Sequence, residues 1–146
     1  MTFLLEYIIR IIVSTIAGLL IGQTRRNKPA GPRTFALISL GATIFTLVSM
    51  GELIANPDPT KVISNIVAGI GFLGVGVIWK TDNKLVGLTT AAAIWVTAAV
   101  GILIGLGTWE LSAVSLVIVI ALLYSKPLEK RIEKQIDTLN KKKKMS

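Results

Sequence analysis

The chain has 146 residues, of which 52% are hydrophobic and 16% charged, and its mean hydropathy is +0.69. Soluble domains carry about 25% charged residues, and close to half of the charges here follow residue 125, so the first 125 residues are too apolar for a water-soluble fold. The absence of cysteine and histidine excludes disulfides, thiolate nucleophiles, imidazole bases and the usual zinc ligands, and we expect neither an enzyme nor a bound cofactor.

The net charge of +8 indicates membrane topology rather than nucleic-acid binding, because the positive residues gather in three short segments. These segments are residues 25–33, Lys80 to Lys84, and the tail after residue 125. Membrane proteins keep such segments on the cytoplasmic side. We therefore predict an all-α, multi-pass helical bundle of about five transmembrane helices in the cell membrane, with the N-terminus outside and the C-terminus inside.

The first predicted span, residues 3–22, contains two charges and a glycine step. Glu6 and Arg10 are spaced i,i+4 in the order that favours a helical ion pair. A charge inside a span indicates a functional site, whereas a position within one turn of the interface would let Glu6 reach the surface. Gly18 and Gly22 form a GxxxG step, which is typical of close helix packing.

The loop at residues 23–33 is basic and interrupted by proline and glycine. Arg25, Arg26 and Arg33 form the candidate ligand- or partner-binding set, because guanidinium groups bind phosphate oxygens through paired hydrogen bonds. The alternative is a positive anchor to anionic lipid head groups.

The second span is predicted at residues 34–50, and an outer loop follows at residues 51–60. Glu52 and Asp58 are the only acids of that loop. Magnesium prefers oxygen ligands from carboxylates and water, so Asp58 is the candidate metal residue if a cation binds at all.

The third span, within residues 64–79, carries four glycines and one amide, Asn65. A dinucleotide-binding fingerprint would need an acidic residue about 20 positions further on, and Thr89 to Trp95 contains none. On a helix the glycines fall on two sides. Small residues mark helix contacts in membranes, so we expect neighbouring helices close to Gly69, Gly71, Gly74 and Gly76.

The fourth span, residues 88–105, repeats small residues every four positions and should lie against another helix along this ridge. The ridge consists of Thr89, Ala93, Thr97, Gly101 and Gly105. Thr89 and Asn65 are the candidate polar residues inside the membrane. The smooth ridge and the GxxxG step together predict a homodimer.

A fifth span is predicted at residues 111–125, and residues 126–146 should form a basic amphipathic cytoplasmic tail.

The order and spacing of several short motifs resemble the MgtC/SapB family of bacterial and archaeal inner-membrane proteins, over about residues 5–125. The motifs are Leu20-Ile21-Gly22 before Arg25-Arg26, Pro29-Ala30-Gly31-Pro32-Arg33-Thr34, Leu40-Gly41-Ala42, Asp58-Pro59-Thr60, the glycine-rich stretch 67–76, and Gly87-Leu88-Thr89-Thr90-Ala91-Ala92 leading to Trp95. The resemblance implies a transmembrane domain at residues 1–125. It also implies a role in growth under magnesium limitation and in survival inside host cells. The F-type ATP synthase is an implied partner, because at least one family member is held to restrain it.

The chain departs from the family pattern at several positions. Gln23 and Thr24 stand where the family usually has a glutamate, and Val86 stands where it usually has an arginine. Asn65 replaces a glutamine, Lys61 replaces an arginine, and we expect no soluble C-terminal domain of the kind that many members carry.

Two functions follow from these observations. The first is a regulatory or partner-binding membrane protein linked to magnesium homeostasis, because the sequence combines small-residue packing with a basic inner face. The alternative is a divalent cation transporter or channel, with Mg²⁺ as the ligand. The scarcity of membrane-facing acids favours the first function.

Overall fold

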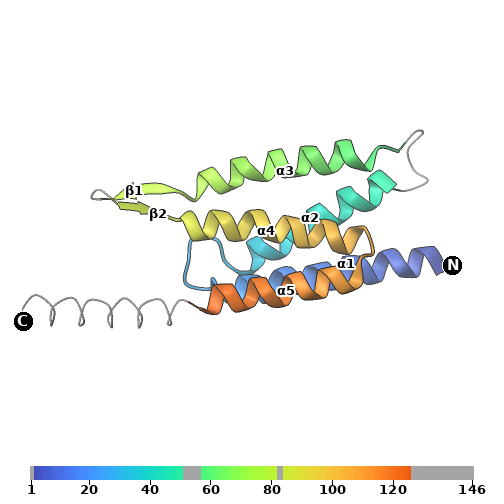
Figure 1. Cartoon of the computed structure of the whole chain (residues 1–146), viewed down its shortest axis with the longest axis horizontal. Helices are drawn as coiled ribbons and strands as arrows, with labels where there is room; N and C mark the ends of the chain where they lie inside the picture. The colour runs from blue at the N-terminus through green and yellow to red at the C-terminus, as the bar shows by residue number, and fades with distance from the viewer. Residues whose placement is uncertain (1, 51–56, 82–83, 126–146) are drawn as a thin grey trace, which may run out of the picture.

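The computed structural model describes residues 2–50, 57–81 and 84–125, and these residues confirm the predicted all-α helical bundle. The predicted tail at residues 126–146 and Glu52 lie outside the described residues. Five helices alternate in direction along the long axis (Figure 1): α1 (Thr2–Gln23), α2 (Pro32–Met50), α3 (Pro59–Gly76), α4 (Leu88–Gly105) and α5 (Trp109–Tyr124).

A short antiparallel hairpin, which the sequence analysis did not predict, joins α3 to α4. It consists of β1 (Trp79–Thr81) and β2 (Lys84–Val86), with Trp79 opposite Val86. The hairpin lies at the same end of the bundle as the turn between α1 and α2 (Figure 1). The two basic segments of the loops therefore share one end, as the predicted topology requires.

Helix length supports four of the five predicted spans. By length and composition, α1 from Leu4, α2, α3 and α4 can each cross a membrane. Helix α5 has 16 residues, which corresponds to about 24 Å at 1.5 Å per residue, whereas the hydrocarbon core is about 30 Å thick. The fifth span and the orientation in the membrane stay predictions.

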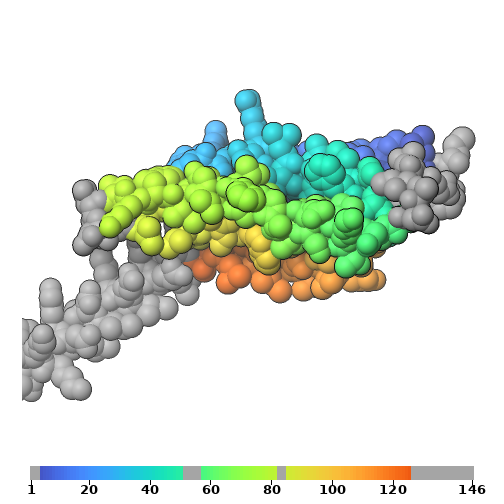
Figure 2. All heavy atoms as spheres, turned by 90° about the horizontal axis from the view of Figure 1, so that it is seen from above, coloured from blue at the N-terminus to red at the C-terminus, as the bar shows by residue number. Residues whose placement is uncertain are grey.

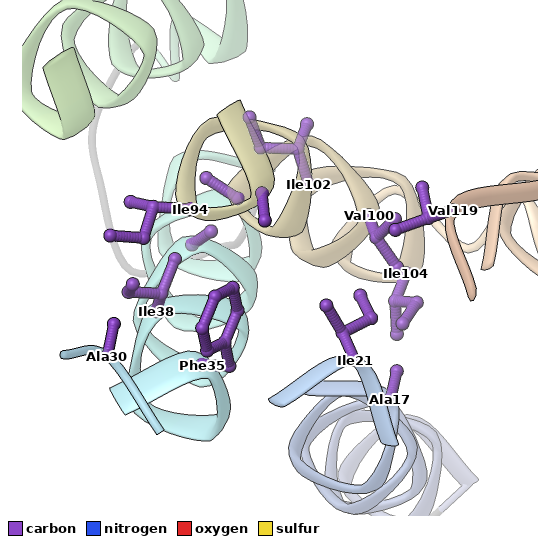
Figure 3. Packing of buried hydrophobic residues seen from close by; sticks show 13 residues of the cluster. Ala17, Ile21, Ala30, Phe35, Ile38, Ile94, Val100, Ile102, Ile104 and Val119 are labelled. Carbon is purple, nitrogen blue, oxygen red and sulfur yellow. The ribbon is translucent and has the colours of Figure 1, made fainter. Parts of the chain in front are cut away.

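The hydrophobic core lies where α4 meets α1, α2 and α5 (Figure 3). Its largest buried side chains include Phe35 of α2, Ile21 of α1, and Ile94 and Ile104 of α4. Glycines let the backbones approach at two places. A Cβ atom added to Gly105 would lie 2.7 Å from the Thr46 Cβ, and one added to Gly22 would lie 2.5 Å from the Pro32 Cα.

Helix α2 packs against the glycines of both small-residue surfaces from which the homodimer was predicted, the GxxxG step of α1 and the ridge of α4. Gly18 and Gly22 face the start of α2, whereas Gly101 and Gly105 face its middle, near Ser39 and Thr46. The α4 ridge thus does lie against another helix at its two glycines, but that helix belongs to the same chain. Neither surface is free to form the predicted dimer, because an intramolecular helix already uses it.

Helix α3 differs most from the expectation, because it is the least covered of the four long helices. Gly74 is its single buried residue, and a Cβ atom added there would lie 3.7 Å from the Ala91 Cβ. A Cβ atom added to Gly69, Gly71 or Gly76 would meet none of the described atoms within 4 Å. Figure 2 shows α3 on the face of the molecule, with α2 on one side and α4 and α5 on the other.

Three buried hydroxyl groups connect α1, α2 and α4. The Thr43 Oγ1 lies 2.6 Å from the Ser14 Oγ and donates to the Gly101 carbonyl oxygen at 2.7 Å, while the Ser14 and Ser39 Oγ atoms lie 2.9 Å apart. All three side chains are fully buried. Buried hydroxyl groups need such partners because no water replaces them.

Thr43→Val should lower the free energy of unfolding by about 0.5–2 kcal/mol, because the valine side chain can neither donate to the Gly101 carbonyl nor accept from the Ser14 hydroxyl. Denaturation in mixed detergent micelles, followed by circular dichroism, measures this change. Thr97→Val is the matched control, since the equally buried Thr97 hydroxyl donates only to Ala93 in its own helix, at 2.6 Å. Equal losses in the two variants would contradict the role given to the interhelical bonds.

Candidate functional site

The charged pair of the first span, Glu6 and Arg10, forms an ion pair at the end of the bundle opposite the hairpin. The Arg10 Nη1 also donates to the Gly105 carbonyl oxygen at 2.6 Å. This carbonyl belongs to the last turn of α4, where oxygens lack helical donors and the helix dipole favours a cation. The Arg10 side chain is 13% exposed and that of Glu6 45%. The hydrogen bond from Arg10 to Gly105 links α1 to the end of α4.

Asp58, the candidate metal residue, caps the N-terminus of α3. Its carboxylate accepts a hydrogen bond from the Lys61 backbone N–H at 3.1 Å, and Pro59 occupies the first turn. Aspartate followed by proline is a common helix start. Within the described ranges, no three acidic residues come together as a metal site. The structure thus gives Asp58 a capping role that the sequence analysis did not identify.

Asn65 and Thr89, the candidate polar residues inside the membrane, lie in different hollows. Asn65 is exposed and lines an apolar groove of about 650 Å³ between α2 and α3, together with Thr34, Gly41 and Gly69. Thr89 lies at the start of α4, beside the hairpin. The two residues therefore do not share one polar path.

The three candidate arginines also separate. Arg25 is buried, with 3% of its surface exposed, and its Nη2 donates to the Thr90 Oγ1 at 2.6 Å. Burial lowers the pKa of Arg25, because desolvation disfavours its charged form. Arg26 and Arg33 are exposed. The predicted basic face is thus divided into one buried cation and two cations at the surface.

Arg25 lines a pocket of about 310 Å³ between the turn after α1, the hairpin and the start of α4. We call it the Arg25 pocket; its other lining residues are Lys28, Pro29, Trp79, Leu85, Val86, Gly87, Leu88, Thr89 and Thr90. The sequence analysis missed Lys28, Trp79 and Thr90 as site residues. The Gly87-Leu88-Thr89-Thr90 motif was the available signal, because a glycine before a polar helix start is typical of a site near backbone N–H groups.

Gly87 places the start of α4 against the hairpin. Its φ of 97° is in the left-handed region, and a side chain there would collide with the Val77 carbonyl group. Gly87 is the N-cap of α4, and no side chain caps this end of the helix by a hydrogen bond. The first backbone N–H groups of α4 thus remain available at the pocket.

The family model described as the MgtC family matches residues 11–131 of the chain. Among curated proteins, the chain is 44% identical over 115 residues to "Putative magnesium transporter YhiD" of Escherichia coli K12, covering 73% of this chain and 54% of that protein.

Two further relatives are similarly close. The chain is 40% identical over 117 residues to "Protein MgtC" of Salmonella typhimurium LT2, covering 78% of this chain and 49% of the relative. It is 35% identical over 120 residues to "Protein SrpB" of Synechococcus elongatus, covering 72% and 66%. The chain thus spans about half the length of the first relatives it matches. No solved structure matches it.

Proposed function

The chain belongs to the MgtC family, and we propose that it is a regulatory, partner-binding protein of the cell membrane that serves magnesium homeostasis. The link to magnesium rests on the name of the Escherichia coli relative. The regulatory role rests on how much of each membrane-crossing helix is buried against the other helices of the chain.

The observation that carries the proposal is the exposure of α3. Of the four long helices, α3 has the lowest hydropathy and the smallest buried share. Helices exposed to lipid are expected to be apolar, and α1, which is also largely exposed, meets this expectation. Helix α3 instead exposes Asn65, Gly69 and Gly76, which lie on one side of the helix. Small and amide side chains at the surface of a span are typical of a contact with another helix.

We assign this surface to a transmembrane helix of a second membrane protein. An amide exposed to lipid lacks hydrogen-bond partners, and a facing helix can supply them. The open space at Gly69 and Gly76, which lie on the same side of α3 as Asn65, allows a backbone to approach closely. A second copy of the chain and a lipid chain in the groove are the competing occupants.

The alternative function, a Mg²⁺ transporter, is favoured by the name of the same relative. A pathway for Mg²⁺ needs several oxygen atoms that are free to replace its water ligands. In the described bundle the inner hydroxyl groups of Thr43, Thr46 and Thr97 donate to backbone carbonyls, and Glu6 pairs with Arg10. Because these oxygen atoms already have hydrogen-bond or ion-pair partners, the regulatory function is better supported.

Photo-cross-linking in intact cells tests the proposed occupant. A photoreactive amino acid at Phe72 of α3, which is 83% exposed, should give a discrete product with one membrane protein, identified by mass spectrometry. The same group at Val117 of α5, which is 67% exposed, is the matched control and should give none. Gly69→Leu should abolish the product without unfolding the chain, because Gly69 faces open space.

Three results would contradict the assignment. A product of twice the chain mass would identify a second copy as the occupant. Cross-links to lipid alone would identify the lipid chain. Equal products from Phe72 and Val117 would show that α3 has no specific partner.

A further inference from the structure

We propose that the Arg25 pocket binds a phosphate group, either free phosphate or the phosphate of a lipid head group. This inference uses other residues than the contact proposed for α3, and neither depends on the other. It rests on a buried cation, an uncapped helix N-terminus and a second cation at the pocket wall.

Arg25 supplies the first reason. Arg25 is only 3% exposed, and its Nε lies buried without a hydrogen-bond partner in the described part of the chain. Among the described residues, no carboxylate lies within ion-pair distance of Arg25, whereas Arg10 has Glu6. A buried guanidinium without an anion loses hydration that the hydrogen bond to the Thr90 hydroxyl replaces only in part. An anion in the pocket would supply both the charge and the missing acceptor.

The start of α4 supplies the second reason. This helix has 18 residues, and its N-terminus lines the same pocket through Leu88, Thr89 and Thr90. No side chain caps it. The free N–H groups and the positive end of the helix dipole together favour a phosphate oxygen. The Arg25 side chain already contacts this turn through the Thr90 hydroxyl.

The walls and the volume of the pocket indicate the charge and the size of the ligand. Lys28 adds a second positive charge, and its side chain is exposed, so it can reach a ligand at the pocket entrance. Trp79 and Leu88 provide an apolar wall. A volume of about 310 Å³ exceeds what a single phosphate needs and leaves room for the glycerol portion of a lipid. Both sources share the phosphate group, which the arginine, lysine and N–H groups recognise.

Trp79 offers a direct probe of occupancy. In a variant with Trp95→Phe and Trp109→Phe, both at exposed positions, Trp79 is the remaining tryptophan. The chain is held in micelles of dodecyl maltoside, a detergent without phosphate, and titrated with inorganic phosphate, against chloride at equal ionic strength. A second series adds phosphatidylglycerol to the micelles. We expect a saturating change in Trp79 fluorescence in at least one series.

Variants in this background assign the response to the pocket. Arg25→Gln should weaken binding about tenfold or more, as expected for the loss of a charged hydrogen-bond donor. Lys28→Gln should weaken it several-fold, and because Lys28 is exposed this variant should fold normally. Arg26→Gln is the matched control, since Arg26 is adjacent, equally charged and outside the pocket wall. Val86→Arg adds a cation to the wall and should tighten binding.

Each outcome decides the proposal. A response to phosphate alone identifies the free ion, and a response to phosphatidylglycerol alone identifies the lipid. No response in either series would overturn the proposal. Equal weakening by Arg26→Gln and Lys28→Gln would overturn it as well, because the effect would then follow the overall charge and not the pocket.

Discussion

Replacing Gly18 with alanine is expected to destabilise the protein by about 1–3 kcal/mol, although alanine is the better helix former. The added Cβ would lie 2.5 Å from the Phe35 carbonyl oxygen and 2.6 Å from the Ala36 Cα. Both atoms belong to the backbone of α2, so no side-chain rotation can relieve the collision. The two helices must move apart, and the packing of α1 on α2 is lost. Denaturation followed by circular dichroism measures the change.

Gly41→Ala on α2 is the matched control for this prediction. A Cβ atom at Gly41 meets none of the described atoms within 4 Å. The substitution should therefore stabilise the helix by about 0.5–1 kcal/mol, through the lower entropy of the unfolded chain. The two alanine substitutions should thus have opposite signs. A loss at Gly41 as large as that at Gly18 would refute the packing described for α1 and α2.

Gly87→Ala should have the larger effect, about 2–5 kcal/mol, because two costs add. The φ of 97° places an alanine in the left-handed region, and its Cβ would lie 2.9 Å from the Val77 carbonyl carbon. The start of α4 must then move away from the end of α3 and from the hairpin. Because this start lines the Arg25 pocket, the variant should also lose the phosphate response of Trp79.

Gly76→Ala, at the last residue of α3, serves as the control at the same end of the bundle. Its added Cβ would face open space, so stability and the phosphate response should both be retained. A Gly87→Ala variant as stable as the unsubstituted chain would contradict the conformation described for this turn.

Several features were predictable because they depend on sequence-local properties. Hydropathy and length located the long helices, and α4 begins and ends where it was expected, at Leu88 and Gly105. The i+4 spacing of Thr97, Gly101 and Gly105 defines one side of a helix, and another helix does lie there. The two basic loops are separated by two membrane-crossing helices, so they were expected at the same end of the bundle.

The partners of these surfaces could not be predicted, since a glycine indicates a close approach without identifying the approaching helix. Helix α3 has the densest glycines yet the smallest buried share of the four long helices, and only the three-dimensional packing reveals this. The sequence equally could not show that Arg25 is buried while Arg26 is exposed, because that difference depends on α4 covering the turn. The hairpin strands, with three residues each, are too short for a clear alternating pattern.

The α3 surface and the Arg25 pocket suggest how a regulatory role would be organised. The α3 surface lies within the membrane-crossing region, and the pocket lies at the end where both basic loops meet. The hairpin and Gly87 connect the end of α3 to the start of α4. A phosphate group bound at the pocket would therefore lie beside the segment that connects α3 to α4.

Magnesium flux into proteoliposomes tests the regulatory function most directly. The purified chain is inserted into sealed vesicles that contain a magnesium indicator, and an ionophore added at the end confirms that the indicator responds. We predict that Mg²⁺ enters no faster than into empty vesicles, and that Asp58→Asn and Glu6→Gln change nothing. Saturable entry that either substitution lowers would contradict the account and establish the transporter function in its place.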